Sequence, residues 1–138
     1  MAEAVPAVSV RNLRKSFGAL EVLKGVSFDA HDGDVISILG ASGSGKSTLL
    51  RCINMLETPT SGDVVAAGET TRLRQRRDGT SEPADQVQID RIRAGLGMVF
   101  QSFNLWSHMT VLDNVMEAPV HVQKRPKAAV RDEAMAIL

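Results

Sequence analysis

Nine consecutive residues in the first half of the chain have the types and spacing of a phosphate-binding loop. They are Gly40, Ala41, Ser42, Gly43, Ser44, Gly45, Lys46, Ser47 and Thr48, and they satisfy the pattern Gly-x-x-x-x-Gly-Lys-Ser/Thr. The glycines allow the backbone to turn so that successive N–H groups face one anionic centre. A plain Gly/Ser-rich turn would not explain a lysine followed by two hydroxyl residues. The loop is therefore predicted to bind a nucleoside triphosphate.

Each polar residue of this loop has a predicted role. Lys46 offers a mobile positive charge to the β- and γ-phosphates, and the Ser47 hydroxyl is a hard oxygen ligand suited to Mg²⁺. Thr48 is placed to help hold the α- and β-phosphates. A helix that begins near Lys46 adds unpaired N–H groups and the positive end of its dipole.

Such a loop must leave a buried strand and enter a helix. The compact apolar run at residues 34–39 predicts a buried parallel strand, and the apolar spacing in residues 48–56 predicts the helix. Residues 96–100 predict a second buried strand. Further strands are expected at residues 8–10, 22–28 and 64–67.

The remaining segments carry boundary signals. Residues 70–86 are polar and predict a loop or insertion, and residues 85–93 predict a helix. Thr110 and Asp113 resemble a capping box that opens a helix, which Pro119 should end or kink. A last helix is expected over residues 127–138, with Pro126 in its first turn.

Composition limits the class of protein. The chain has 138 residues, within the range of one domain, and 16 basic residues balance 16 acidic ones, which argues against a dedicated nucleic-acid binder. Cys52 is the only cysteine and is expected to be a buried thiol. Residues 1–20 have no apolar core of a secretory signal, and no apolar run is long enough to cross a bilayer. Any membrane role is therefore expected to come through a partner.

Three segments outside the loop distinguish among the proteins that carry such a loop. They are Arg14-Lys-Ser-Phe-Gly18 with the strand that follows it, Thr58-Pro-Thr-Ser-Gly-Asp63, and the stretch from Gly97 to Val115. Together they resemble the ATP-binding cassette (ABC) ATPases. The resemblance implies an α/β fold: a P-loop core with an N-terminal antiparallel β layer and the start of a helical subdomain. It divides the chain into an ATP-binding core at 1–100 and a Q-loop with the start of the helical subdomain at 101–138.

The resemblance also adds site residues. In this family an aromatic residue at the position of Phe17 stacks on adenine. The resemblance, together with the phosphate-binding loop, makes ATP with Mg²⁺ the expected cofactor. Gln101 stands where the family has the Q-loop glutamine, whose side-chain oxygen approaches Mg²⁺ and the attacking water. Catalytic roles are thus expected for Lys46 and Gln101, and metal ligation for Ser47 and Gln101. Phe103, Leu105 and Trp106 are expected to be half core and half docking surface for a permease helix; His31, His108 and His121 are expected at the surface, without a metal.

The stretch from Phe103 to Pro119 and the polar insertion before Gly97 resemble the ATPases of polar amino-acid uptake systems, for basic amino acids or for octopine and nopaline. This kinship implies integral-membrane permease subunits as partners, a second copy of the ATPase, and a periplasmic solute-binding protein indirectly, with no nucleic acid. It places the protein peripherally on the cytoplasmic face of the bacterial inner membrane. A non-transport ABC ATPase of DNA repair or translation, a transporter of another solute and an inert nucleotide binder are the alternatives.

Several family motifs are absent from the 138 residues: the signature Leu-Ser-Gly-Gly-Gln, a Walker B strand ending in Asp, the catalytic Glu and the switch His. The chain is therefore expected to be roughly the N-terminal half of such a domain. It is expected to bind nucleotide weakly, without useful hydrolysis.

Overall fold

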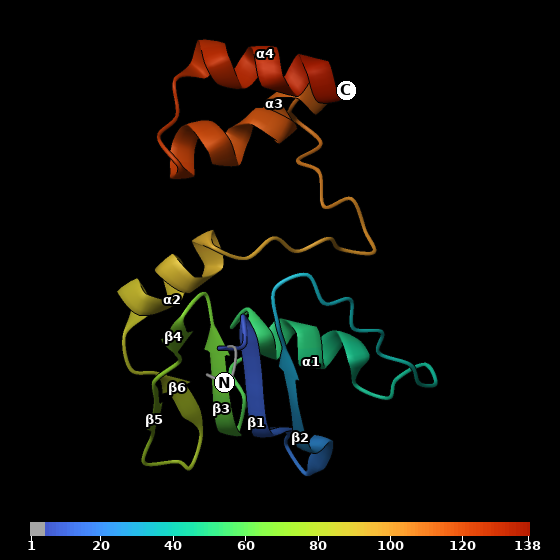
Figure 1. Cartoon of the computed structure of the whole chain (residues 1–138), viewed down its shortest axis with the longest axis vertical. Helices are drawn as coiled ribbons and strands as arrows, with labels where there is room; N and C mark the ends of the chain where they lie inside the picture. Colours follow the sequence, from blue (N-terminus) through green and yellow to red (C-terminus); the bar gives the residue numbers. More distant parts are fainter. Residues whose placement is uncertain (1–4) are drawn as a thin grey trace. The chain divides into compact units, whose positions relative to one another are not determined.

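The computed structural model describes residues 5–138, which divide into two compact units (Figure 1). The first unit ends at Gly97 and the second begins at Met98. Each unit has its own buried cluster of apolar side chains. None of the helices in residues 5–138 has the length and apolar character needed to cross a membrane.

The first unit is built on a four-stranded antiparallel sheet in the order β2-β1-β3-β4. Its strands are β1 Val8–Phe17, β2 Leu20–Ala30, β3 Ser61–Ala66 and β4 Glu69–Thr70. β1 pairs with β2 on one side and with β3 on the other. The expected antiparallel layer is confirmed, and its strands extend well beyond the short segments predicted.

Gly62 shows why a glycine is needed where β3 begins. Its φ is +98°, and a Cβ added there would lie 2.5 Å from the carbonyl oxygen of Asn12 and 2.6 Å from the Cα of Leu13. Both neighbours are backbone atoms, so they cannot yield by changing a rotamer. The backbones of β1 and β3 therefore approach closely here because residue 62 has no side chain.

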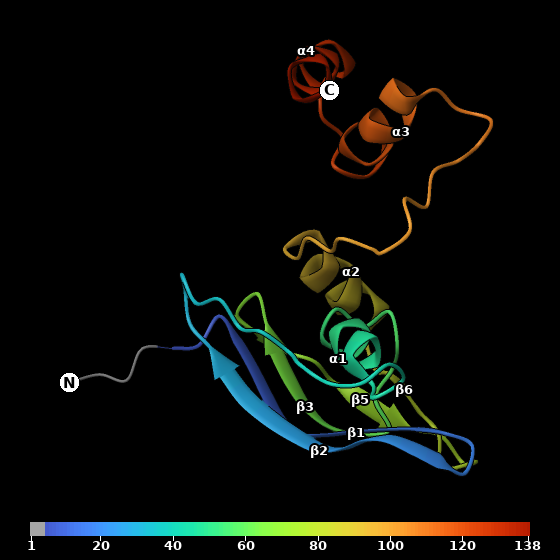
Figure 2. The same cartoon turned by 90° about the vertical axis from the view of Figure 1, so that its right-hand side faces the viewer.

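Two helices pack on one face of this sheet, as Figure 2 shows: α1 Lys46–Ile53 and α2 Gln86–Ala94. The core joins strand and helix residues: Val10, Leu13, Leu23, Leu49, Cys52, Val64, Ala66 and Ile92. Cys52 is fully buried, as expected, and burial raises the pKa of its thiol to about 11. Asp85 caps α2 by accepting from the N–H groups of Val87 and Gln88, so the predicted start of that helix is confirmed.

The two helices are also joined by polar contacts. The guanidinium of Arg93 in α2 donates to the carbonyl oxygen of Met55 at 2.5 Å and to that of Asn54 at 3.3 Å. Asn54 is the C-cap of α1, and Met55 follows it. Arg93 thus ties the segment directly after α1 to α2.

The polar insertion is a hairpin rather than a loop, so the prediction for residues 70–86 is wrong in part. β5 Leu73–Gln75 and β6 Ser81–Pro83 pair antiparallel. Arg74 and Arg76 both form ion pairs with Glu82, and this arrangement lowers the pKa of the Glu82 carboxyl. Cross-strand ion pairs of this kind are not visible in residue types alone.

Two predicted buried strands are absent from the described part of the chain. Residues 34–39 and 96–100 form no strand, and Val35, Leu39 and Val99 are 93%, 91% and 97% exposed. A parallel strand gains its ladder hydrogen bonds and its burial only from neighbouring strands and covering helices. Within residues 5–138 neither segment has such a neighbour.

The second unit is helical. It consists of α3 Val111–Glu117, a π-helical turn η1 at Ala118–Val122 and α4 Lys127–Ile137, packed around Met116, Val130 and Ala134. Thr110 caps α3 by accepting from the N–H of Asp113 at 3.1 Å. The α-helix ends two residues before Pro119, and α4 begins directly after Pro126. The expected cap, interruption and final helix are therefore confirmed.

Candidate nucleotide-binding site

The phosphate-binding loop runs directly into α1, as its pattern predicts. Gly45 occupies the N-cap position with φ +96°, and its carbonyl accepts the first intrahelical bond, from Leu49 N at 2.8 Å. No side chain caps this helix within the part of the chain that the structure describes. The N–H groups of the first turn are consequently available to an anion at the loop, where the helix dipole also favours negative charge.

Gly45 also seats the loop against the sheet. A Cβ at this position would lie 2.9 Å from Cγ1 of Val22 and 3.2 Å from Cδ2 of Leu23, both in β2. Any larger residue would push the loop away from the strand. The sequence pattern requires glycine at this position. The structure gives two reasons for that requirement: the positive φ and the close packing against β2.

The side chain of Lys46 is hydrogen-bonded to the first residues of the loop. Its ammonium donates to the carbonyl oxygens of Gly40 and Ala41, each at 2.8 Å, while Ser44 N donates to Ala41 O at 3.2 Å. These bonds hold the positive charge beside the same turn whose N–H groups would meet a phosphate. Residues 41–44 and Ser47 are exposed, so a ligand can reach them from solvent.

A cavity of about 440 Å³ lies between the loop and β2. It is lined by Leu20, Glu21, Val22, Leu23, Lys24, Val26, Gly43 and Ser44. Leu20 is the cross-strand partner of Phe17, so the aromatic ring stands at the end of the hairpin that forms this wall. The only acidic lining residue, Glu21, is paired with Arg14 at 2.8 Å, which offsets its charge near a site for phosphates.

Phe17 is 47% exposed, too accessible for an ordinary core residue. Lys15 places its ammonium 4.7 Å from the centroid of the Phe17 ring, and the side chain of Lys15 is only 13% exposed. Sequence reasoning missed Lys15. The signal was present, because residues two apart in a strand share a face of the sheet.

Gln101 lies in the second unit and is exposed, whereas the loop and Phe17 belong to the first unit. No group of three or more His, Cys, Asp or Glu residues that could hold a metal occurs among residues 5–138. Protein sites for Mg²⁺ that also use nucleotide phosphates need only one or two protein ligands. The exposed hydroxyl of Ser47 at the start of α1 fits that requirement.

The three aromatic and apolar residues predicted to be half core are largely exposed: Phe103 by 92%, Leu105 by 54% and Trp106 by 52%. The expected core contribution of Phe103 is therefore wrong in the described structure, since no element covers its side chain. Trp106 stacks on His108 with ring centroids 6.1 Å apart. Asn114 fixes this turn, accepting from Trp106 N at 2.8 Å and donating to Trp106 O at 3.2 Å.

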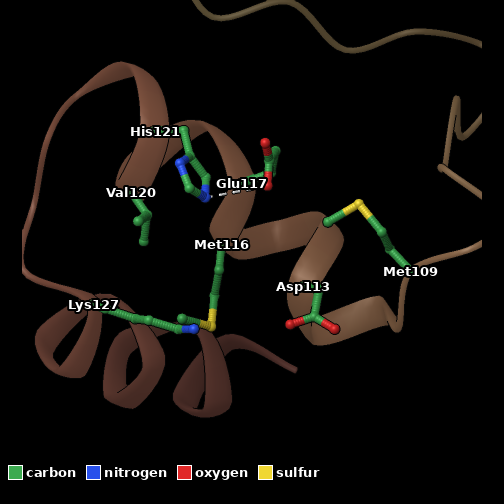
Figure 3. A pocket seen from close by; sticks show the side chains of 7 residues that line it. All are labelled: Met109, Asp113, Met116, Glu117, Val120, His121 and Lys127. Carbon is green, nitrogen blue, oxygen red and sulfur yellow. Dashed lines mark ion pairs between the residues drawn. The ribbon is translucent and has the colours of Figure 1, made fainter.

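A smaller cavity of about 200 Å³ lies within the second unit (Figure 3). Its lining consists of Met109, Asp113, Met116, Glu117, Val120, His121 and Lys127. Met116 points from α3 toward α4, and His121 is exposed and forms an ion pair with Glu117 at 3.7 Å. This cavity combines apolar walls with side chains of both charges. The uncapped N–H groups of the phosphate-binding loop are not part of its lining.

Residues 23–137 match the family model described as ABC transporter. The chain belongs to the ABC transporter family. The octopine permease ATP-binding protein P of Rhizobium radiobacter is 59% identical over 133 residues, which is 96% of this chain and 51% of that protein. The histidine/lysine/arginine/ornithine transport ATP-binding protein HisP of Escherichia coli (strain K12) is 54% identical over 131 residues, 95% of this chain and 51% of that one. The chain thus spans about half the length of the curated relatives it matches.

A solved ABC transporter structure gives the fold. The dimeric ATP-binding cassette MJ0796, in a post-hydrolysis state bound to ADP and Pi, superimposes with a TM-score of 0.74 at 33% sequence identity. The match covers 94% of this chain and 54% of that one. The ABC ATPase fold and the resemblance to octopine, nopaline and basic amino-acid systems are therefore confirmed.

Proposed function

We propose that the chain is the nucleotide-binding part of an ATPase subunit that energises the import of polar or basic amino acids. The observation that carries this proposal is the loop at residues 40–48. It packs against β2 at Gly45, leads into the uncapped start of α1 and accepts a hydrogen bond from the ammonium of Lys46 at Gly40 O. This combination suits a polyphosphate.

Each site residue has a role in the proposal. The N–H groups of the loop and of the first turn of α1 bind the phosphates, with Thr48 beside them, and Lys46 leaves its carbonyl partners to meet the β- and γ-phosphates. Ser47 ligates Mg²⁺, which neutralises phosphate charge when bound. Phe17 stacks on adenine. Gln101 contributes a second oxygen to the metal and orients water.

The layout of the domain is also part of the proposal. Residues 1–100 form the ATP-binding core, and residues 101–138 form the Q-loop and the start of the helical subdomain. The break between compact units at Gly97 and Met98 supports a boundary close to this position.

The partners follow from the relatives. The names of the octopine and histidine relatives speak of permease and transport systems, and the solved cassette is a dimer. We therefore assign to this protein integral-membrane permease subunits, a second copy of the ATPase and an indirect solute-binding protein, with a peripheral position on the cytoplasmic face of the bacterial inner membrane. Hydrolysis belongs to the complete dimer in this proposal.

Nucleotide binding is tested by equilibrium dialysis of the 138-residue chain with labelled ATP and Mg²⁺. Lys46→Ala should weaken binding about tenfold or more, because it removes charge-assisted bonds to phosphate. Lys124→Ala removes the same charge in the second unit and should leave binding unchanged. Equal binding by the wild type and Lys46→Ala would overturn the assignment of the loop.

The transport role is tested in the cell from which the chain derives. Replacing Lys46 by Ala in the chromosomal gene should abolish uptake of labelled arginine, histidine or octopine. Normal uptake of all three, together with sensitivity to DNA damage or slowed translation, would instead favour a non-transport ABC ATPase.

A further inference from the structure

Lys15 lies behind the aromatic ring that the proposed function assigns to adenine. Its ammonium is 4.7 Å from the ring centroid of Phe17. With one face of the ring covered in this way and Phe17 still 47% exposed, the opposite face is the one open to a ligand. The contact is a cation–π interaction, which is stronger where the cation has lost water.

The cation has indeed lost most of its water. The side chain of Lys15 is 13% exposed, and its ammonium donates to the carbonyl oxygen of Thr58 at 2.7 Å and pairs with the Glu57 carboxylate at 3.1 Å. Thus a carbonyl and a carboxylate anchor the ammonium while the ring lies above it. A long flexible side chain is thereby held in one place.

The turn that anchors Lys15 is itself fixed to the strand that carries Phe17. Thr60 N donates to Arg14 O at 2.8 Å, and Ser16 N donates to the Thr60 hydroxyl at 3.0 Å. Pro59 between them is fully buried. The turn that holds the Lys15 ammonium and the strand that carries Phe17 are therefore joined into one rigid unit.

We propose that Lys15 is a positioning residue for the nucleobase: it supports the inner face of the Phe17 ring so that the outer face is held ready for adenine. This inference rests on the proposed function, since it needs adenine at Phe17. Two effects act together. The ring is ordered before binding, which lowers the entropy lost on stacking. The cation draws π density to the inner face, which reduces the repulsion between the outer face and an electron-rich base.

The test separates the base from the phosphates. Binding of ATP and of inorganic tripolyphosphate, both with Mg²⁺, is measured on the 138-residue chain by competition against labelled ATP. Lys15→Met should weaken ATP binding about five-fold while leaving tripolyphosphate binding unchanged, because tripolyphosphate has no base to stack. Lys15→Arg, which keeps a cation at the ring, should stay within about two-fold of the wild type.

Two further variants complete the design. Phe17→Ala should weaken ATP binding about tenfold without affecting tripolyphosphate, and adding Lys15→Met to it should change nothing more. Lys124→Met is the matched control for loss of one lysine charge, and it should behave as the wild type with both ligands.

The outcomes are distinguishable. If Phe17→Ala leaves ATP binding intact, the adenine stack of the proposed function is wrong, and the role of Lys15 falls with it. If Phe17→Ala weakens ATP binding and Lys15→Met does not, the positioning role alone is overturned. It is also overturned if Lys15→Met weakens tripolyphosphate as much as ATP, which would show a general structural role. Should Lys15→Met fail to fold, Glu57→Gln is measured in its place. A smaller selective loss of ATP binding supports the proposal, and equal effects on both ligands contradict it.

Discussion

At the scale of single residues, Gly45 is a position where backbone conformation and packing both require glycine. Its φ of +96° disfavours any side chain, and β2 occupies the space that a Cβ would need. Gly79 in the hairpin turn has a similar φ of +81° but no atom within 4 Å of an added Cβ. Comparing substitutions at these two glycines therefore separates the effect of backbone strain from that of steric overlap.

Gly45→Ala should lower the free energy of unfolding of the first unit by roughly 2–4 kcal/mol, against roughly 1 kcal/mol for Gly79→Ala. The extra loss comes from the contacts with Val22 and Leu23. Urea unfolding followed by circular dichroism measures both variants. Equal losses would show that β2 yields to the added methyl group.

Glu69 supplies a residue-scale prediction on pH. Its hydrogen bonds from Arg91, at the edge of the sheet, lower the pKa of the Glu69 carboxyl to about 2 from an ordinary value of 4.5. A carboxyl with a lowered pKa in the folded state adds stability that is fully present above its unfolded pKa and is lost as the pH falls through its folded pKa. The contribution should therefore disappear between about pH 4.5 and about pH 2.

The variant Glu69→Gln isolates this contribution. Its unfolding midpoint in urea should lie below that of the wild type at pH 6, and the gap should narrow as the pH falls from about 4.5 to about 2, because protonation of Glu69 then removes the charged pair from the wild type. Arg91→Met should show the same convergence, and the double variant should lose no more than either single one. A constant gap at all pH values would rule out the ion pair as the cause.

At the scale of the elements, local signals predicted helices better than strands. Thr110 predicted the first turn of α3, since a cap is a contact between residues three apart, and residues 85–93 predicted α2. The runs at residues 34–39 and 96–100 carried equally clear apolar patterns, yet they form no strand in the described structure. A strand depends on partners remote in sequence, and residue types alone do not reveal whether those partners are present.

The same distinction holds for the site. Residues 40–48 could be predicted as a phosphate-binding loop because the residues that form it are consecutive in the sequence. The cover of Phe17 by Lys15 depends on a third segment, at Glu57 and Thr58, more than forty residues away in the chain. Only the folded arrangement shows that the lysine is anchored rather than solvated.

The cap of α3 gives an element-scale prediction. Thr110→Ala removes the acceptor for Asp113 N and should destabilise the second unit by about 1 kcal/mol. Hydrogen exchange of the α3 amides should accelerate accordingly, while Thr110→Ser should restore protection. Thr70→Ala, an exposed threonine in β4, is the matched control and should leave α3 unchanged.

At the scale of the whole molecule, we expect the exposed apolar runs to govern the behaviour of the chain in solution. Val35 and Leu39 are more than 90% exposed, and they lie in a run rich in β-forming residues. Such a run offers unpaired backbone groups together with apolar side chains, which favours association between chains. We expect the 138-residue chain to self-associate at micromolar concentration.

Replacing both Val35 and Leu39 by serine should shift the chain toward the monomer, as measured by size-exclusion chromatography with light scattering. Val5→Ser is the control, because Val5 is 86% exposed and lies outside the run at residues 35–39. If Val5→Ser reduces association as much as the double variant, general hydrophobicity is responsible instead of the run at residues 35–39.

The bonds from Arg93 to Asn54 and Met55 have a mechanical consequence. α1 is a rod of eight residues, about 12 Å long, with the phosphate-binding loop at one end and these two carbonyls near the other. Arg93 stands four residues before the junction at Gly97. A displacement of α1 along its own axis would therefore act on these two bonds and, through Arg93, on α2.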